Sequence, residues 1–193
     1  MLEIKNTEVH GIERAMLVSG YPHAVDEIDT VKPSLDRLKK LGKCDIGSGH
    51  DVSLSGIIIQ YDLKAPLYFW KQFQRYHFHQ INSSTSTMHS AAKMNIKLHC
   101  NEYVEPEIIS LVQFYQSEYI KNNTHKNYMR LIANIPSGFE LWAGITSNYQ
   151  QIKTQYFQRK NHKLDEWKVY CKWILELPYF KELTGVEKWV INY

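Results

Sequence analysis

The stretch from Ala65 to His89 constrains the fold of this chain more than any other part of the sequence. In its first half, Leu67, Trp70, Phe73 and His77 recur at steps of three or four, which predicts a helix with an apolar stripe that ends in a histidine. Its second half, residues 80–88, consists mostly of hydroxyl and amide side chains, which favour loops, caps and ligand contacts over helix interiors. A helix that leads into such a loop predicts a site for an anionic, ring-bearing ligand.

Length and composition indicate one globular domain. The chain has 193 residues, of which 44% are hydrophobic, so we expect a single domain over residues 1–193 with a sizeable core. A net charge of +3 is too small to indicate a nucleic-acid partner. No apolar run is long enough to cross a bilayer, and no leader pattern is recognisable, so we expect no membrane partner. Three widely spaced cysteines fit a reducing cytoplasm, which is the localisation we expect.

The N-terminal half predicts alternating strands and helices. Apolar residues 15–18 predict a strand, and leucines at steps of three predict a helix that starts near Ser34. Residues 42–50 form a glycine-punctuated loop that ends at His50. Residues 54–63, with three consecutive isoleucines, predict the clearest strand.

The C-terminal half is mainly helical by pattern. A strand is predicted over residues 94–100, helices over 106–119, 127–134 and 164–175, and a packed aromatic tail over 179–193. Ser137 and Glu140 match a capping box, which predicts a long helix to about Lys160. Together these elements predict an α+β fold.

A polar stripe follows the predicted long helix beside its apolar face, whereas Lys153 takes a more solvent-like side. Such a stripe lines a cleft or covers a helix–helix seam, and the pattern favours neither interpretation. Its members are Asn148, Gln151, Gln155, Arg159 and His162.

Two simpler interpretations apply to the first stretch. His77 and His79 are separated by one residue, but no Asp, Cys or Glu at ligand spacing joins them, so we expect no metal site. The hydroxyl-rich segment alone also fits a solvated turn, and a histidine after a glycine loop is more often a surface or capping residue.

The triplet Arg75-Tyr76-His77 and the loop after it resemble the signature of the flavin-dependent thymidylate synthases. That signature has an Arg-His-Arg triplet, followed by a polar loop with Asn-Glu and Ser-x-Arg. Asn82 occupies the family's Asn position. Ser83, Thr85 and Thr87 stand where the family has Glu, Ser and Arg.

Spacings elsewhere extend the resemblance over residues 49–88 and 135–166. His50 precedes Arg75 by 25 residues and Gln72 precedes it by three, as in the family. Asn148 and Arg159 have the family's separation of eleven residues on a helix. Arg130 is displaced, because it lies six residues before Pro136 whereas the family's arginine lies four before its proline.

The resemblance implies a flavin-dependent thymidylate synthase-like fold with an antiparallel sheet and packed helices. It also implies a homotetramer that binds FAD and methylates dUMP reductively, with methylenetetrahydrofolate as carbon donor and NADPH as hydride source. Implied FAD-binding residues are His50, Arg75, Tyr76, His77 and Asn148. Implied substrate-binding residues are Gln72, Ser83, Thr85, Thr87, Arg130 and Arg159, while no catalytic nucleophile is indicated.

Two alternatives remain open from the sequence. One is a non-catalytic relative that keeps the fold and a nucleotide or flavin pocket. The other is a flavoenzyme with a changed substrate, because the family's Glu, Ser and second Arg are all replaced.

Overall fold

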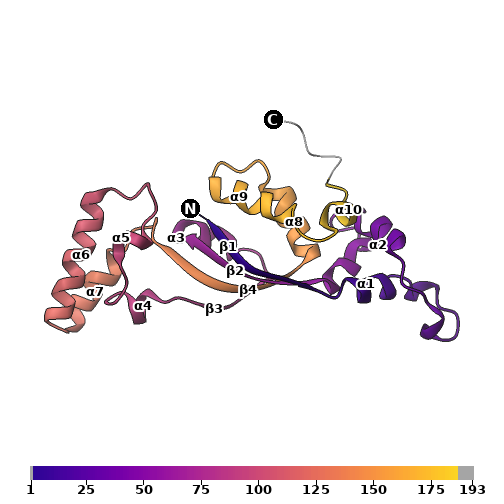
Figure 1. The fold of residues 1–193 in the computed structure, drawn as a ribbon, viewed down its shortest axis with the longest axis horizontal. Coiled ribbons are helices and arrows are strands. Elements are labelled where there is room, and N and C mark those ends of the chain that lie inside the picture. Colours follow the sequence, from indigo (N-terminus) through magenta and orange to yellow (C-terminus); the bar gives the residue numbers. More distant parts are fainter. Residues whose placement is uncertain (1, 187–193) are drawn as a thin grey trace. The chain divides into compact units, whose positions relative to one another are not determined.

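The computed structural model describes residues 2–186, and within them four strands form one sheet with the order β1-β2-β4-β3 (Figure 1). The strands are β1 (Glu3–His10), β2 (Ile58–Pro66), β3 (Gln80–Ser84) and β4 (Glu140–Asn148). The Gln60 side chain donates to the Thr146 hydroxyl, and the Leu67 N–H donates to the Phe139 carbonyl. Residues later in β2 therefore pair with residues earlier in β4, so these two strands are antiparallel. The predicted α+β class is confirmed.

The chain divides into two compact units. Unit 1 comprises Met1–Lys5, Asp62–His77 and Ile81–Ile145, and unit 2 comprises Asn6–Tyr61, Phe78–Gln80 and Thr146–Tyr193. Each of the four strands has residues in both units. The single domain expected from the sequence stays a prediction.

Unit 1 contains a small core around Val112, Leu131 and Phe139. A pair of helices, α6 and α7, lie side by side over it (Figure 1). The helix α6 starts with Pro106, whose missing N–H is not needed in a first turn, and Thr124 caps α7 by accepting from the Asn127 N–H. The helices of this unit are α3 (Leu67–Phe73), α4 (Thr87–Ser90), α5 (Ile96–His99), α6 (Pro106–Lys121) and α7 (His125–Ala133).

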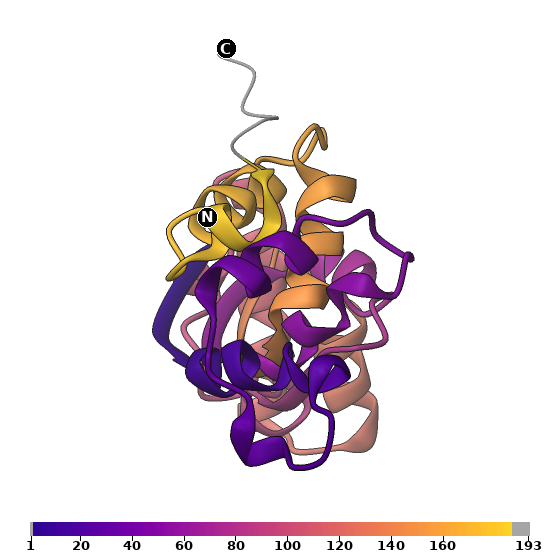
Figure 2. The same ribbon diagram turned by 90° about the vertical axis from the view of Figure 1, so that its right-hand side faces the viewer.

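Unit 2 places helices over the sheet residues that belong to it. The Trp173 ring lies 4.5 Å from that of Tyr61, and its indole N–H donates to Thr7. At the other end of the unit, α10 lies against α2, as Figure 2 also shows. The α-helices are α1 (Ile12–Val18), α2 (Leu35–Gly42), α8 (Tyr149–Arg159), α9 (Asp165–Ile174) and α10 (Phe180–Thr184), and the 3-10 helices are η1 (Tyr21–His23), η2 (Ile28–Thr30) and η3 (His50–Gly56).

Several predicted helices are confirmed within a few residues of their predicted ends. These are α2, whose cap is Ser34, together with α6, α7 and α9. The part of the predicted tail that forms α10 packs on the rest of the chain, because Phe180 and Leu183 are buried there. Residues 187–193 of the tail lie outside the described residues. No helix in the described part of the chain is long and apolar enough to cross a membrane.

Three predicted elements are wrong. Residues 15–18 lie in helix α1, because a short apolar run fits a buried helix turn as well as a strand. Residues 96–99 form a helical turn, which the Asn95 side chain caps by accepting from the Leu98 N–H. The predicted long helix is a strand over residues 140–148 followed by α8, and Glu140 forms an ion pair with Lys64 at 2.9 Å instead of a capping box.

Other boundaries move. The strand predicted over residues 54–63 starts at Ile58, because η3 takes the residues before it. The hydroxyl-rich segment predicted as a loop begins as β3, an edge strand whose residues are mostly exposed. The helix of the first stretch ends at Phe73, so the Arg75 triplet follows it instead of lying within it.

Candidate functional site

The Arg75 triplet lies in a turn directly after α3 in unit 1. The Arg75 N–H donates to the Gln72 carbonyl at 3.3 Å, and the Tyr76 N–H donates to the Phe73 carbonyl at 3.2 Å. Arg75 and His77 are exposed, while Gln72 and Tyr76 are half-buried. The turn therefore presents a guanidinium and an imidazole to solvent, beside a phenol ring.

Two predicted substrate residues share one surface depression in unit 1. Ser83 and Thr85 line a volume of about 390 Å³ together with Asp62, Trp142 and Gly144. Pairing continues past the end of β3, because the Thr85 N–H donates to the Trp142 carbonyl at 2.8 Å and the Trp142 N–H donates to the Thr85 hydroxyl at 3.1 Å. The hydroxyl-rich segment is therefore held in register at this point, instead of being a solvated turn.

Sequence reasoning missed Asp62 and Trp142 as lining residues of this depression. Trp142 fell within the predicted helix, where its position relative to β3 could not be seen. In the structure its ring is half-buried and lies 5.1 Å from the Lys5 ammonium nitrogen. The depression thus combines hydroxyls, a carboxylate and an indole ring.

The other two predicted residues of unit 1 lie elsewhere. Thr87 begins α4 and lines a separate pocket of about 260 Å³ with His89, Lys93 and Tyr128. The Arg130 guanidinium lies 4.6 Å from the centre of the Tyr115 ring, a cation–π geometry. Arg130 therefore contacts the α6–α7 pair rather than the depression that Ser83 lines.

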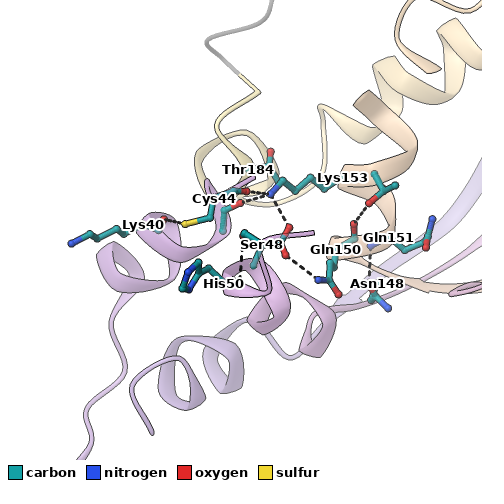
Figure 3. A network of polar contacts seen from close by, with 12 residues as sticks. Lys40, Cys44, Ser48, His50, Asn148, Gln150, Gln151, Lys153 and Thr184 are labelled. Carbon is teal, nitrogen blue, oxygen red and sulfur yellow. Dashed lines mark hydrogen bonds and ion pairs between the residues drawn. The ribbon is translucent and has the colours of Figure 1, made fainter. Parts of the chain in front are cut away.

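In unit 2, the two ends of α8 hold the predicted pair Asn148 and Arg159. The Asn148 Oδ1 accepts from the Gln151 N–H at 2.9 Å, which makes Asn148 the N-cap of α8 (Figure 3). Arg159 is the last residue of the helix, and its guanidinium lies 4.7 Å from the centre of the buried Trp167 ring. Eleven residues of helix separate the pair by about 16 Å.

Gln155, in the middle of the polar stripe of α8, bonds to α9. Gln151 and Gln155 are 7% and 0% exposed, and the Gln155 Oε1 accepts from the Tyr170 hydroxyl at 2.7 Å. Burial, and next the charge of Arg159, lower the pKa of His162, and its Nδ1 accepts from the Leu164 N–H. For Gln155 the seam interpretation is therefore the correct one.

His50 lies at the start of η3 and is exposed, but the next residue anchors a buried network (Figure 3). The Asp51 carboxylate accepts from the Lys153 ammonium at 2.8 Å and from the Gln150 amide at 3.0 Å. The same ammonium donates to the carbonyls of Gly42 and Cys44 at 2.9 and 2.6 Å. Lys153 is only 2% exposed, so its predicted solvent-like position is wrong.

The network holds the glycine-punctuated loop against α8. The three N–H bonds of the lysine ammonium donate to three partners from residues 42–51. A buried ammonium needs an opposite charge and an acceptor for each N–H, and these partners supply both. The loop and α8 also border a cavity of about 430 Å³, which Lys43, Cys44, Phe157 and Gly185 line. The sequence held no signal for this anchor beyond the presence of Asp51 next to His50.

Two cysteine thiols have pKa values raised by burial. Burial, slightly offset by Arg159, raises the pKa of the Cys171 thiol to about 12, so it stays protonated. Burial raises the pKa of the Cys100 thiol as well, with a smaller contribution from Glu140. Across residues 2–186, no three His, Cys, Asp or Glu side chains are grouped so that they could hold a metal ion.

Comparison with known proteins gives a match in structure only. Neither a protein-family model nor a curated protein matches the sequence. One solved structure, thymidylate synthase X (ThyX) from Helicobacter pylori with FAD and dUMP, superposes with a TM-score of 0.70 at 13% identity, covering 94% of this chain and 96% of that one. A second structure of the flavin-dependent ThyX from Helicobacter pylori, complexed with FAD and dUMP, gives a TM-score of 0.67 at 12% identity and covers 93% and 96%. The chain therefore has the fold of the flavin-dependent thymidylate synthases.

Proposed function

We propose that this protein is a divergent flavin-dependent enzyme of the thymidylate synthase type, which binds FAD and acts on a pyrimidine nucleotide. The main support is the shared fold, which extends over 94% of the chain and matches a protein that was solved with FAD and dUMP. Independent support comes from the residues at the family's signature positions, of which Arg75, His77, Ser83 and Thr85 are exposed.

The residues present fit a flavin dinucleotide by their donor chemistry. A diphosphate needs cationic donors, and Arg75 presents an exposed guanidinium suited to phosphate oxygens. Flavin and adenine rings stack on flat side chains, and those at the family's flavin positions are Tyr76 and His77 in unit 1 and His50 in unit 2. The Asn148 Oδ1 is committed to capping α8, so only its amide N–H groups remain to donate to a ligand. When bound, the flavin would supply the redox chemistry, and the protein would supply binding and orientation.

The nucleotide would contact the hydroxyl-rich segment. In this proposal the Ser83 hydroxyl donates to the nucleotide from the depression that it shares with Thr85, whose own hydroxyl bonds to the backbone of Trp142. Gln72 stands at a nucleotide-contacting position of the family, and Arg159 stands at the position of the arginine that contacts the pyrimidine ring. We expect binding of the nucleotide's phosphate to be weaker than in the family, because Thr87 replaces an arginine and Arg130 lies over Tyr115. NADPH and methylenetetrahydrofolate are the co-substrates that the family reaction would require.

Flavin binding is the first test. The purified protein should be yellow, or should quench the fluorescence of added FAD with a micromolar or lower Kd. Arg75→Ala should weaken this binding roughly tenfold or more, because it removes one charge-assisted contact. Lys71→Ala, a neighbouring exposed cation on α3, is the matched control. A colourless protein that leaves FAD fluorescence unchanged would rule out an FAD-dependent enzyme.

Nucleotide binding is the second test. Each lost charge-assisted bond to phosphate costs on the order of 1.5–3 kcal/mol, so calorimetric titration should show weak dUMP binding, and a thymidine-requiring strain should not be rescued. Arg159→Ala should abolish the residual binding. Tight dUMP binding with full rescue would instead show that the hydroxyl-rich segment replaces the missing arginine.

A second candidate is a non-catalytic relative or a flavoenzyme with a changed substrate. The observation that favours it is the chemistry of the depression, where Ser83 replaces the family's Glu and the nearby carboxylate belongs to Asp62 on β2. FAD binding without dUMP binding would favour a changed substrate. Absence of both would favour a protein that keeps only the fold.

A further inference from the structure

The surface that would join two copies of this chain is not the one its aromatic residues suggest. Tyr61, Tyr68, Phe69 and Trp70 form an aromatic cluster in the sequence that suits an interface. In the structure Tyr61, Phe69 and Trp70 are 3%, 0% and 7% exposed, so they pack inside the chain. A subunit interface needs another surface.

Helix α6 has one side packed on the core of unit 1. Val112 is fully buried there, and Ile109, Tyr115 and Tyr119 pack around it. The Gln116 amide donates to the carbonyls of Ala91 and Met94, both at 2.7 Å. These contacts determine which side of the helix faces away from the core.

The outer side of α6 is apolar at its centre. Leu111 and Phe114 lie three residues apart on it and are 42% and 51% exposed. The two serines that flank them bond to their own helix: the Ser110 hydroxyl donates to the Pro106 carbonyl and the Ser117 hydroxyl to the Phe114 carbonyl. Their hydroxyls therefore need no water, and this side can be buried at little polar cost.

Charges at the two ends of this side are opposite and equidistant from its centre. Glu107 lies seven residues before Phe114, and Lys121 lies seven residues after it, so all three share one side of the helix. Within the chain the Lys121 ammonium also lies 3.9 Å from the Glu118 carboxylate, and this exposed pair leaves it donors for a second carboxylate. An antiparallel copy of α6 centred on Phe114 would bring each Glu107 beside the Lys121 of the other copy. The helix dipoles would also be antiparallel, which is the favourable arrangement.

We propose that the outer side of α6 is an interface at which two copies of this chain pair antiparallel across a two-fold axis at Phe114. The charge pattern favours a second copy over an unrelated partner, because the surface is complementary to itself under that symmetry. One helix pair buries less than a full stable interface, so the contact belongs to a larger assembly or forms a weak dimer. It does not depend on flavin or nucleotide binding.

Cysteine cross-linking tests the pairing and its direction. In a chain with Cys44→Ser and Cys100→Ser, Phe114→Cys should form a disulfide-linked dimer on mild oxidation. Glu107→Cys and Lys121→Cys chains should cross-link when mixed, and neither should cross-link alone. Cross-linking of Glu107→Cys with itself would indicate parallel pairing and overturn the proposal, as would the absence of any α6 cross-link.

A charge swap and a mass measurement complete the test without ligands. Glu107→Lys and Lys121→Glu should each weaken the association roughly ten- to a hundredfold, and the double variant should restore it. The variant Leu111→Glu with Phe114→Glu should halve the mass measured by light scattering, whereas Val25→Glu, a control at a 90% exposed position, should not change it. A mass unchanged in the α6 variant, with circular dichroism showing the fold intact, would overturn the proposal. FAD and dUMP binding by the same variants tests the proposed function separately.

Discussion

At the scale of single residues, Lys153 stabilises unit 2 through contacts that its sequence position does not reveal. The side chains of Lys153 and Asp51 are 3% and 1% exposed. Lys153→Met should lower the free energy of unfolding by about 3–5 kcal/mol, because Asp51 would be left as an unpaired buried charge. Denaturant unfolding followed by circular dichroism measures this. Lys168→Met is the matched control, because it removes only an exposed ion pair with Asp165 and should leave stability nearly unchanged.

The double variant Lys153→Met with Asp51→Leu separates burial from pairing. Removing both charges eliminates the unpaired carboxylate, so the double variant should be less destabilised than the sum of the two single variants. Strict additivity of the two changes would show that the pair contributes no coupling.

Cys171 provides a second test at the residue scale, through pH. Its thiol has a folded pKa of about 12 against an ordinary value of 9.0, so the folded state holds the proton more tightly than the unfolded state. The contribution of this thiol to the free energy of unfolding is fully present below about pH 9 and should be lost as pH rises from there toward 12. Cys171→Ala should show a shallower alkaline loss of stability. In the folded wild-type protein, a thiol reagent at pH 8 should modify Cys44 and leave Cys171 unmodified until the chain unfolds.

At the scale of elements, Asn148 has two separable tasks. Asn148→Ala should cost about 0.5–2 kcal/mol of stability because α8 loses its N-cap. Asn148→Ser keeps a capping oxygen but has no amide N–H, so it should retain stability. If Asn148 also binds flavin, both variants should weaken FAD binding, measured by fluorescence quenching. Loss of FAD binding in the alanine variant alone would indicate that the residue acts only through the cap.

At the scale of the whole molecule, the family resemblance predicts a homotetramer. Light scattering after size exclusion should then give about four times the chain mass of 22.8 kDa. A monomer at micromolar concentration would argue against the tetramer.

The sequence by itself determined the helices that have a clear apolar periodicity, which are α2, α6, α7 and α9. It also indicated the fold through the spacings of the Arg75 triplet and the Asn148–Arg159 pair, although few identities support them. These features are local or depend on counting residues, so they are visible without a structure.

Only the tertiary structure decided the state of residues 140–148, the burial of Lys153 and the lining of the depression at Ser83. Glu140 matched a helix cap in sequence, but it pairs with Lys64, 76 residues earlier in the chain. Lys153 meets carbonyls and a carboxylate about a hundred residues away, and Thr85 meets Trp142 on another strand. Such contacts satisfy buried polar groups across the fold, and no local pattern of residues specifies them.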